Sequence, residues 1–301
     1  MRNSVLVTGA EGFLGRALVR LLERSDQPVI ALDSSKPTGE ERQSTATKVL
    51  CDITDQQQME KLFREYDIGK IVHLAAVLPT AAQRDPVRAT RVNVVGSVNL
   101  LALARRFAVA RFVFGSSLSI YGSCSPDYVV SEADRAAPED VYGAAKLYVE
   151  QLGQAFTDSR ATEFVSLRIG RVIGPGARSN TSAWRSEMFE FLQTQLPSDL
   201  TLPYVGSERV LLIHVDDVAR ALLALVNAPS TRYAIYNAPC ECWILNELKE
   251  KLESLNPNIR VALGNTYAKG NPRLLDCSRF KNEFAFSAPP IADRLQAATR
   301  T

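Results

Sequence analysis

Short apolar runs alternate with segments of helical periodicity through the first half of the chain. The runs are rich in Val, Ile and Leu, a pattern typical of strands buried on both faces of a parallel sheet. We expect strands at residues 5–7, 29–32, 48–51, 71–74, 111–115 and 163–169. Between them, apolar residues at helical spacing predict helices at 14–24, 56–66, 87–107 and 141–156. This alternation predicts an α/β fold with a Rossmann-like, doubly wound parallel sheet.

The pattern changes after residue 169. Residues 170–180 combine glycine, proline and arginine and predict an irregular stretch. A helix at 182–195, a strand at 211–215 and helices at 216–226 and 246–255 are expected to follow. We therefore expect a larger domain over residues 1–169, with elements near 211–236 returning to it, and a smaller, interleaved C-terminal lobe over residues 170–301.

Composition and charge narrow the class of protein. Of the 301 residues, 46% are hydrophobic and 23% charged, as in globular domains, and the net charge of +2 favours neither nucleic acid nor an anionic membrane as a partner. The apolar run at 218–226 is too short to span a bilayer, and the first strand begins too early to leave room for a signal peptide. Five cysteines without a framework spacing, and only two histidines, predict a cytoplasmic protein with no metal site.

Three glycines separate the first expected strand from the first helix. They are Gly9, Gly12 and Gly15, spaced Gly-x-x-Gly-x-x-Gly instead of the commoner Gly-x-Gly-x-x-Gly. Glycine lets the backbone approach a pyrophosphate closely, and a helix N-terminus offers free N–H groups and the positive end of its dipole. An ordinary tight turn is the alternative explanation for such a triplet.

The second expected strand ends in Asp33, about twenty residues after the glycines, where a carboxylate would accept hydrogen bonds from an adenosine ribose. Asp33 would repel a 2′-phosphate, so NAD is favoured over NADP, although Lys36 lies close by. The alternative is a solvated turn residue. The residues that we expect together at the carboxyl ends of the strands are the Gly9 loop, Asp33, Asp52, Ala75 and Ser117.

Tyr142 and Lys146 lie four residues apart at the start of an expected helix, so both side chains share one face. A lysine ammonium and an oxidised nicotinamide both favour the phenolate, which would bring Tyr142 toward the range useful for proton transfer. Ser117, at a strand end, would hydrogen-bond a substrate oxygen. A merely loop-capping role suits Ser116 and Ser119 better.

Taken together, these features resemble the extended short-chain dehydrogenase/reductases of the NAD-dependent epimerase/dehydratase family. The motifs that carry the resemblance are Thr8–Gly15, Asp52-Ile53, His73–Ala76, Asn93–Asn99, Phe114–Gly122, Tyr142–Lys146, Arg168 with Gly174-Pro175, and His214–Asp217. The cofactor contacts that it implies are Gly9, Gly12, Phe13, Leu14, Gly15, Asp33, Asp52, Ile53, Leu74, Ala75, Ala76, Asn93, Tyr142 and Lys146. It also implies Ser117, Tyr142 and Lys146 as catalytic residues, and a homodimer formed through the helices at 87–107 and 141–156.

Departures from the family pattern concern the substrate. Nucleotide-sugar members usually carry Asn three residues after the arginine at 168, where this chain has Arg171, and Arg209 is one place out of step with the family's next arginine. Guanidinium groups suit carboxylate or phosphate recognition. The expected substrate contacts are Ser117, Ser119, Arg171, Arg178 and Asn180, and Arg185 is expected to be solvated.

Three functions are compatible with these sequence features. The first is an NAD-dependent dehydrogenase acting on a sugar-derived, anionic small molecule. The second is a nucleotide-sugar epimerase with transient NAD reduction or, with less support, a dehydratase, because dehydratases usually carry an acidic pair where Leu118 and Ser119 follow Ser117. The third is a non-catalytic NAD-binding protein, although such proteins commonly lose the Tyr or Lys that this chain retains.

Overall fold

A computed structural model describes residues 4–25, 27–36, 44–157, 162–176, 182–194 and 196–300. Its centre is a parallel seven-stranded sheet with the order β11-β7-β5-β4-β1-β2-β3. The strands are β1 (Ser4–Thr8), β2 (Val29–Asp33), β3 (Thr47–Leu50), β4 (Ile68–His73), β5 (Arg111–Ser117), β7 (Glu163–Ile169) and β11 (Ile235–Asn237). The α/β class and the Rossmann-like order agree with the sequence pattern, because β1, β2, β5 and β7 are short, apolar and almost entirely buried, whereas the edge strand β3 is largely exposed.

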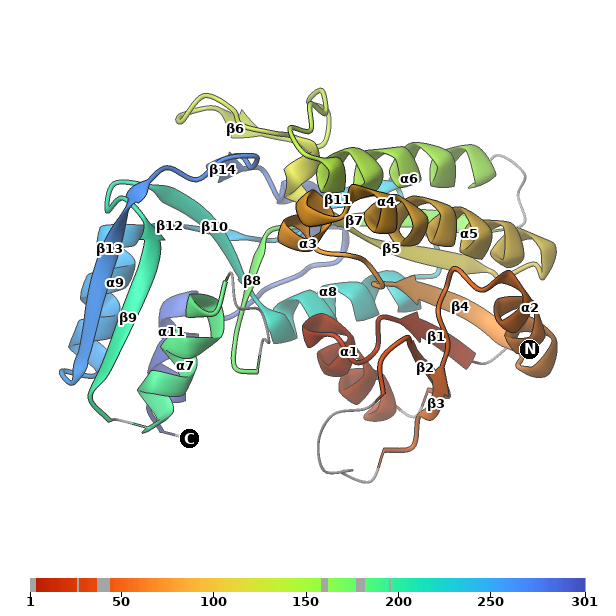
Figure 1. The fold of residues 1–301 in the computed structure, drawn as a ribbon, viewed down its shortest axis with the longest axis horizontal. Coiled ribbons are helices and arrows are strands. Elements are labelled where there is room, and N and C mark those ends of the chain that lie inside the picture. Colours follow the sequence, from red (N-terminus) through yellow and green to blue (C-terminus); the bar gives the residue numbers. More distant parts are fainter. Residues whose placement is uncertain are drawn as a thin grey trace.

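Helices cover both faces of this sheet (Figure 1). On one face α1 (Phe13–Glu23) packs against α8 (Val215–Asn227), and their apolar sides join one core cluster with strands β1 and β7. On the other face lie α2 (Gln56–Glu65), α5 (Ser97–Arg106) and α6 (Val141–Thr157), whose apolar sides form a second cluster. Asp55 caps α2 by accepting from the backbone N–H of Gln58 at 3.0 Å.

The expected helix over 87–107 is found, but it is not a uniform α-helix. It consists of α4 (Pro86–Ala89), a π-helical turn (Thr90–Gly96) and α5, preceded by the short α3 (Pro79–Arg84). A π-helical turn inserts an extra residue and often marks a functional position. Asn93 lies in this turn and is buried, so the insertion falls where a polar side chain points into the protein.

The C-terminal lobe has sheets of its own, at the far end of the molecule from α2 (Figure 1). One sheet has the order β12-β10-β8 and the other pairs β13 with β9. Its elements are β8 (Arg171–Ile173), α7 (Trp184–Thr194), β9 (Ser198–Tyr204), β10 (Arg209–His214), β12 (Glu241–Ile244), α9 (Leu245–Leu255), β13 (Ile259–Thr266) and α11 (Ile291–Ala298). These elements bury a third apolar cluster of their own.

Two expectations about the lobe need correction. Part of the stretch 170–180 is a strand, β8, because its residues pair in parallel with Leu212–His214 of β10. Of the segment 211–236, helix α8 and strand β11 do pack on or join the seven-stranded sheet, but β10 pairs only with β8 and β12. The remaining elements are a 3₁₀ turn (Leu118–Ile120), the paired short strands β6 (Val129–Val130) and β14 (Leu274–Leu275), and α10 (Ser278–Glu283).

No helix within the described ranges is long and apolar enough to cross a membrane.

Candidate active site

The turn between β1 and α1 needs residues without a Cβ at two positions, Gly9 and Gly15. Gly9 has φ +71°, and a Cβ there would lie 2.7 Å from the backbone nitrogen of Ala75. A Cβ on Gly15 would lie 2.1 Å from the carbonyl oxygen of Gly9. Gly12 caps α1 without a side-chain hydrogen bond, and no acidic residue stands in the first turn of that helix. The N-terminal turn of α1 therefore offers backbone N–H groups and a positive helix end, which suit the pyrophosphate of NAD.

Asp33 lies at the carboxyl end of β2, beside this turn, and is half-buried. One carboxylate oxygen accepts from the backbone N–H of Glu11 and the other from that of Ser35, both at 2.9 Å. Asp33 thus fixes the glycine turn to the end of β2. Each carboxylate oxygen has a second lone pair, so the contact to a ribose hydroxyl that the sequence predicts is compatible with this position.

His73 is completely buried at the end of β4, and its ring joins two neighbouring elements. Its Nδ1 lies 2.7 Å from Oγ1 of Thr8 and its Nε2 lies 2.8 Å from Oγ of Ser97. The Thr8 oxygen also accepts from the N–H groups of Leu74 and Ala75 at 3.3 Å, which holds the backbone after β4 against β1. Burial, with a smaller contribution from the Lys146 charge, lowers the pKa of His73 to about 3, so the ring is neutral.

The same relay continues into the π-helical turn. Ser97 donates to the carbonyl oxygen of Asn93 at 2.7 Å. The side-chain amide of Asn93 accepts from the N–H of Val77 at 2.7 Å and donates to its C=O at 2.9 Å. Asn93 therefore fixes the segment that follows Ala76, and the cofactor contact that the resemblance implies for it stays a prediction. Sequence reasoning missed Thr8 and Ser97, because nothing in a local pattern shows that they share a buried histidine.

Two of the cofactor contacts that the resemblance implies, Asp52 and Ile53, follow the end of β3. Asp52 is exposed and its Oδ1 accepts from the N–H of Thr54 at 2.9 Å. Ile53 is buried and packs closely on Gly96, where a Cβ would lie 2.8 Å from the Ile53 side chain. The contacts that the resemblance implies for Asp52 and Ile53 stay predictions.

Tyr142 and Lys146 lie in the first turns of α6 and are both buried. The Lys146 ammonium donates to the carbonyl oxygen of Gly115 at 2.6 Å and lies 5.5 Å from the centre of the Tyr142 ring. Burial lowers the pKa of Lys146 to about 7, a shift that the Glu150 carboxylate opposes. The expected lowering of the pKa of Tyr142 is not found. Burial, and next the Asp140 carboxylate, raise it.

Ser117 ends β5 and caps the 3₁₀ turn that follows. Its Oγ accepts from the backbone N–H of Ser119 at 3.2 Å and from the Ser119 hydroxyl at 2.8 Å. The capping role expected for Ser119 thus belongs to Ser117, and Ser119 is buried behind it. Ser116 caps nothing: its hydroxyl is buried without a hydrogen bond within the described part of the chain.

A buried polar network lies behind Lys146. Glu150, one helical turn further along α6, accepts from Ser166 at 2.8 Å and from Nη2 and Nε of Arg168 at 2.7 and 3.2 Å. Arg168 also donates to the Tyr121 hydroxyl at 2.7 Å, which donates to Asn237 at 2.8 Å. These contacts hold the ends of β7 and β11 in place beside α6.

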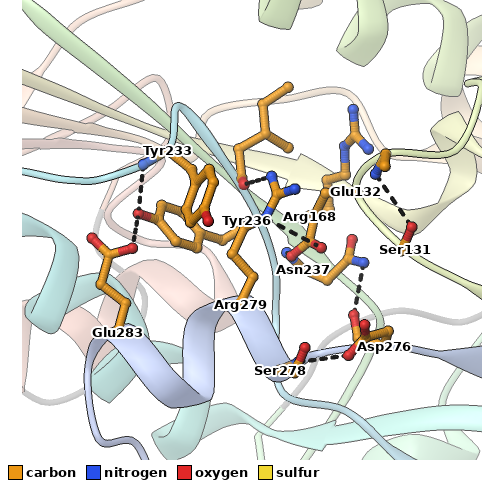
Figure 2. Close-up of polar contacts among 12 residues, drawn as sticks. Ser131, Glu132, Arg168, Tyr233, Tyr236, Asn237, Asp276, Ser278, Arg279 and Glu283 are labelled. Atoms are coloured by element: carbon orange, nitrogen blue, oxygen red, sulfur yellow. Dashed lines mark hydrogen bonds and ion pairs between the residues drawn. The ribbon is translucent and has the colours of Figure 1, made fainter.

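Figure 2 shows how this network continues to Asp276 and to helix α10. The amide of Asn237 donates to the carbonyl oxygen of Asp276 at 3.0 Å, and its backbone N–H donates to Glu132 at 2.8 Å. Arg279 of α10 lies 3.6 Å from Glu132 and 4.2 Å from the centre of the Tyr233 ring. Sequence reasoning had left this region without an assignment, because its residues come from four separate segments.

On the lobe side, Arg171 is the one predicted substrate-binding arginine that falls within the described residues. It begins β8, and its guanidinium lies 5.6 Å from the centre of the Tyr204 ring. Arg185, expected to be solvated, is half-buried instead, and burial and the Arg171 charge lower its pKa to about 10. Arg178 and Asn180 lie outside the described residues.

Metal-binding clusters were also sought. Within the ranges that the structure describes, no group of three or more His, Cys, Asp or Glu side chains could hold a metal ion. All five cysteines are free.

Comparison with known proteins agrees with this geometry. In solved structures, the chain superposes on a UDP-glucose 4-epimerase from Thermotoga maritima with a TM-score of 0.85, 24% identity and coverage of 99% of this chain and 97% of the other. A GalE-like L-threonine dehydrogenase from Cupriavidus necator gives a TM-score of 0.88, 22% identity and coverage of 98% and 99%. At these identities the likeness shows the fold alone.

Sequence comparison gives the family. An uncharacterised epimerase/dehydratase of Staphylococcus aureus (strain USA300) is 24% identical over 304 aligned residues, which cover 94% of this chain and 91% of that protein. The model of the NAD dependent epimerase/dehydratase family matches residues 5–238, which include the glycine turn, Ser117, Tyr142 and Lys146. The chain belongs to the NAD-dependent epimerase/dehydratase family of extended short-chain dehydrogenase/reductase enzymes, whose cofactor is NAD.

Proposed function

We propose that this enzyme moves a hydride between a carbinol carbon of a sugar-derived, anionic substrate and NAD, with Tyr142 as the acid/base. The observation that carries the proposal is the placement of Ser117, Tyr142 and Lys146. Ser117 ends β5, and Lys146 is bonded to Gly115 of the same strand. The chemical residues thus lie at the carboxyl ends of the strands, on the same side of the sheet as the glycine turn.

Each residue has a defined task in this proposal. Bound NAD supplies the hydride acceptor. Ser117 hydrogen-bonds the substrate oxygen, Tyr142 removes the carbinol proton, and Lys146 holds the nicotinamide ribose. Because burial raises the pKa of Tyr142, the phenolate needs positive charge nearby, from the Lys146 ammonium and from the oxidised cofactor. Gly143, between Tyr142 and Lys146, packs on the carbonyl oxygen of Ser119, where a Cβ would lie 2.6 Å away.

The sharpest test of the chemistry is Tyr142→Phe. It removes the hydroxyl and keeps the ring, so we expect kcat to fall by a factor of about 10²–10⁴ while NAD affinity changes less than about twofold. Tyr148→Phe is the matched control, because Tyr148 lies on the same helix and is exposed. A Tyr142→Phe enzyme with undiminished kcat would disprove the acid/base role.

A nucleotide-sugar epimerase is the second candidate, favoured by the likeness to the Thermotoga enzyme, which was solved with UDP-glucose. An epimerase reduces and reoxidises its own cofactor, so it retains NAD through turnover. Quantifying the nicotinamide released from denatured, purified protein separates the two. Near one NAD per chain supports the epimerase, whereas an empty protein that binds added NAD reversibly supports the dehydrogenase.

We also propose a cytoplasmic homodimer formed through α4, the π-helical turn and α6. Val87, Val95 and Tyr148 are exposed on these neighbouring elements, and an apolar surface on paired helices suits self-association. Val95→Glu should give a monomer in analytical ultracentrifugation. Val129→Glu, which changes an exposed valine on β6, should leave the dimer intact. A dimer that survives Val95→Glu, or a wild-type monomer, would refute this interface.

A further inference from the structure

Arg171 stands close to the proposed chemistry. Ile169, the last residue of β7, pairs with Ser117 at the end of β5. Arg171 follows two residues later, which limits its Cα to about 7.6 Å from that of Ile169. β8 then pairs with β10, so Arg171 is held at the point where the seven-stranded sheet gives way to the lobe.

Arg185 approaches the same position from α7. Its carbonyl oxygen accepts from the N–H of Gly174, just after β8, which fixes α7 against that strand. The Nε of Arg185 is buried and has no hydrogen bond within the described part of the chain. The charges of Arg171 and Arg185 repel each other, and the Tyr204 ring lies beside them, with its centre 5.6 Å from the Arg171 guanidinium.

Several other half-buried or buried arginines of the described chain have carboxylate partners. Arg168 pairs with Glu150, Arg273 with Glu208 and Arg294 with Asp217, at 2.6 to 2.7 Å. Neither Arg171 nor Arg185 forms an ion pair with any residue in the described ranges. Two neighbouring guanidinium groups partly removed from water are unfavourable without a negative partner. An anion from outside the described part of the chain would supply that partner.

We propose that Arg171 and Arg185, with the Tyr204 ring as a wall, form the site for the carboxylate or phosphate group of the substrate. The inference rests on the proposed function and deepens it. The anion would be held at the lobe while the carbinol of the same molecule lies at Ser117 and Tyr142. Arginine suits this task because its planar guanidinium binds either oxyanion through two parallel hydrogen bonds. This inference adds two residues, Arg185 and Tyr204, to the expected substrate contacts.

The test is anion binding to the NAD-loaded enzyme, since bound NAD keeps the probe away from the glycine turn. Sodium phosphate and sodium acetate are titrated at constant ionic strength while the unfolding temperature is followed. We expect saturable stabilisation in the wild type and at least about tenfold weaker binding in Arg171→Gln and Arg185→Gln. Arg260→Gln, an exposed arginine of β13 in the same lobe, is the matched control and should behave as the wild type. Stronger binding of phosphate identifies a phosphoester substrate, and stronger binding of acetate identifies a carboxylate.

Variants without a probe anion give an independent readout. If the pair awaits a ligand, Arg185→Gln relieves repulsion and does not lower the unfolding temperature in anion-free buffer. A structural Arg185 would lower it. Arg185→Lys keeps the charge without the planar fork and should restore binding only in part. Unchanged phosphate and acetate binding in Arg185→Gln would overturn the site.

The Tyr142→Phe enzyme separates this inference from the proposed function. It should bind the probe anions like the wild type and fail only in turnover. Loss of anion binding in the arginine variants, combined with an active Tyr142→Phe enzyme, would keep the anion site and reject the proposed chemistry.

Discussion

On the cofactor side of the protein, buried polar groups are hydrogen-bonded within the protein. Thr8 bonds to His73 and to the backbone after β4, and Asn93 bonds to the backbone of Val77, at 2.7 to 3.3 Å. On the lobe side, Arg171 and Arg185 have no carboxylate partner among the described residues. The first region has its polar groups satisfied by the protein, and the second leaves charge to be satisfied by a ligand.

The two regions therefore differ in function: one holds the backbone rigid, and the other is expected to distinguish ligands. A buried, satisfied network holds the backbone around the glycine turn in one arrangement, because breaking any single hydrogen bond leaves a buried group unpaired. Unpaired arginines instead contribute most when an anion arrives. On the proposed function we therefore expect a preformed cofactor site, and we expect the lobe to supply the part that selects among substrates.

The largest effect should come from Gly15→Ala. Its Cβ would lie 2.1 Å from the Gly9 carbonyl oxygen, so the turn must move away from its present shape. We expect NAD affinity to fall by a factor of about 100 or more, since displacements near 1 Å carry costs of that order. Calorimetric titration with NAD measures it. Gly270→Ala is the control: Gly270 has φ +71°, but a Cβ there meets nothing within 4 Å, so the change should cost some stability and leave NAD affinity unchanged.

Because the buried His73 ring is neutral, the free energy of unfolding should decrease at acidic pH. The folded pKa is about 3 and the unfolded value about 6.5, so below pH 6.5 the unfolded chain binds the extra proton. The free energy of unfolding should therefore decrease by about 1.4 kcal/mol per pH unit on this account, from about pH 6.5 down to about pH 3.

Urea unfolding of His73→Phe tests the origin of that slope. Phenylalanine keeps an aromatic ring beside Phe112 and Phe114 but does not titrate, so the acid slope should drop by about one proton. Ser97→Ala breaks the same relay without removing the titrating group, and its slope should match the wild type. Equal slopes in His73→Phe and the wild type would show that His73 is not the source.

Asp33 lies on the cofactor side of the protein, and it is also expected to contact bound NAD. Asp33→Ala should weaken NAD binding about tenfold, the loss of one charge-assisted hydrogen bond, and reduce discrimination against NADP. Asp33→Asn can still accept from the Glu11 N–H while losing the charge, so it separates tethering of the turn from rejection of a 2′-phosphate. NAD and NADP affinities measured side by side would contradict the assignment if both stayed at wild-type values.

The smallest effect should come from Arg16, which joins the two regions. Its guanidinium donates to the carbonyl oxygens of Glu11 in the glycine turn and of Gly176 after β8, the latter at 3.0 Å. Arg16→Ala should lower the free energy of unfolding by about 1 kcal/mol and raise the KM for substrate more than that for NAD. Arg20→Ala, an exposed residue on the same helix, is the control. An equal rise in both KM values would argue against a selective link to the lobe.

Local sequence signals determined the scaffold of this protein. Apolar runs marked the strands of the large sheet, the three glycines marked the turn, and a four-residue spacing placed Tyr142 and Lys146 on one helix face. These features were readable because the physical cause of each lies within a few neighbouring residues: side-chain periodicity, a missing Cβ, a helical turn.

Contacts between distant segments produced the lobe sheets, the His73 relay, the raised pKa of Tyr142 and the burial of Arg185 beside Arg171. β8 pairs with a strand some forty residues later, and His73 bonds to Thr8 across 65 positions. Burial and charge of this kind arise from segments distant in sequence, and no local window contains them. The sequence therefore specified which chemistry the chain carries, and the packing of distant segments decided which of its charges remain for a ligand.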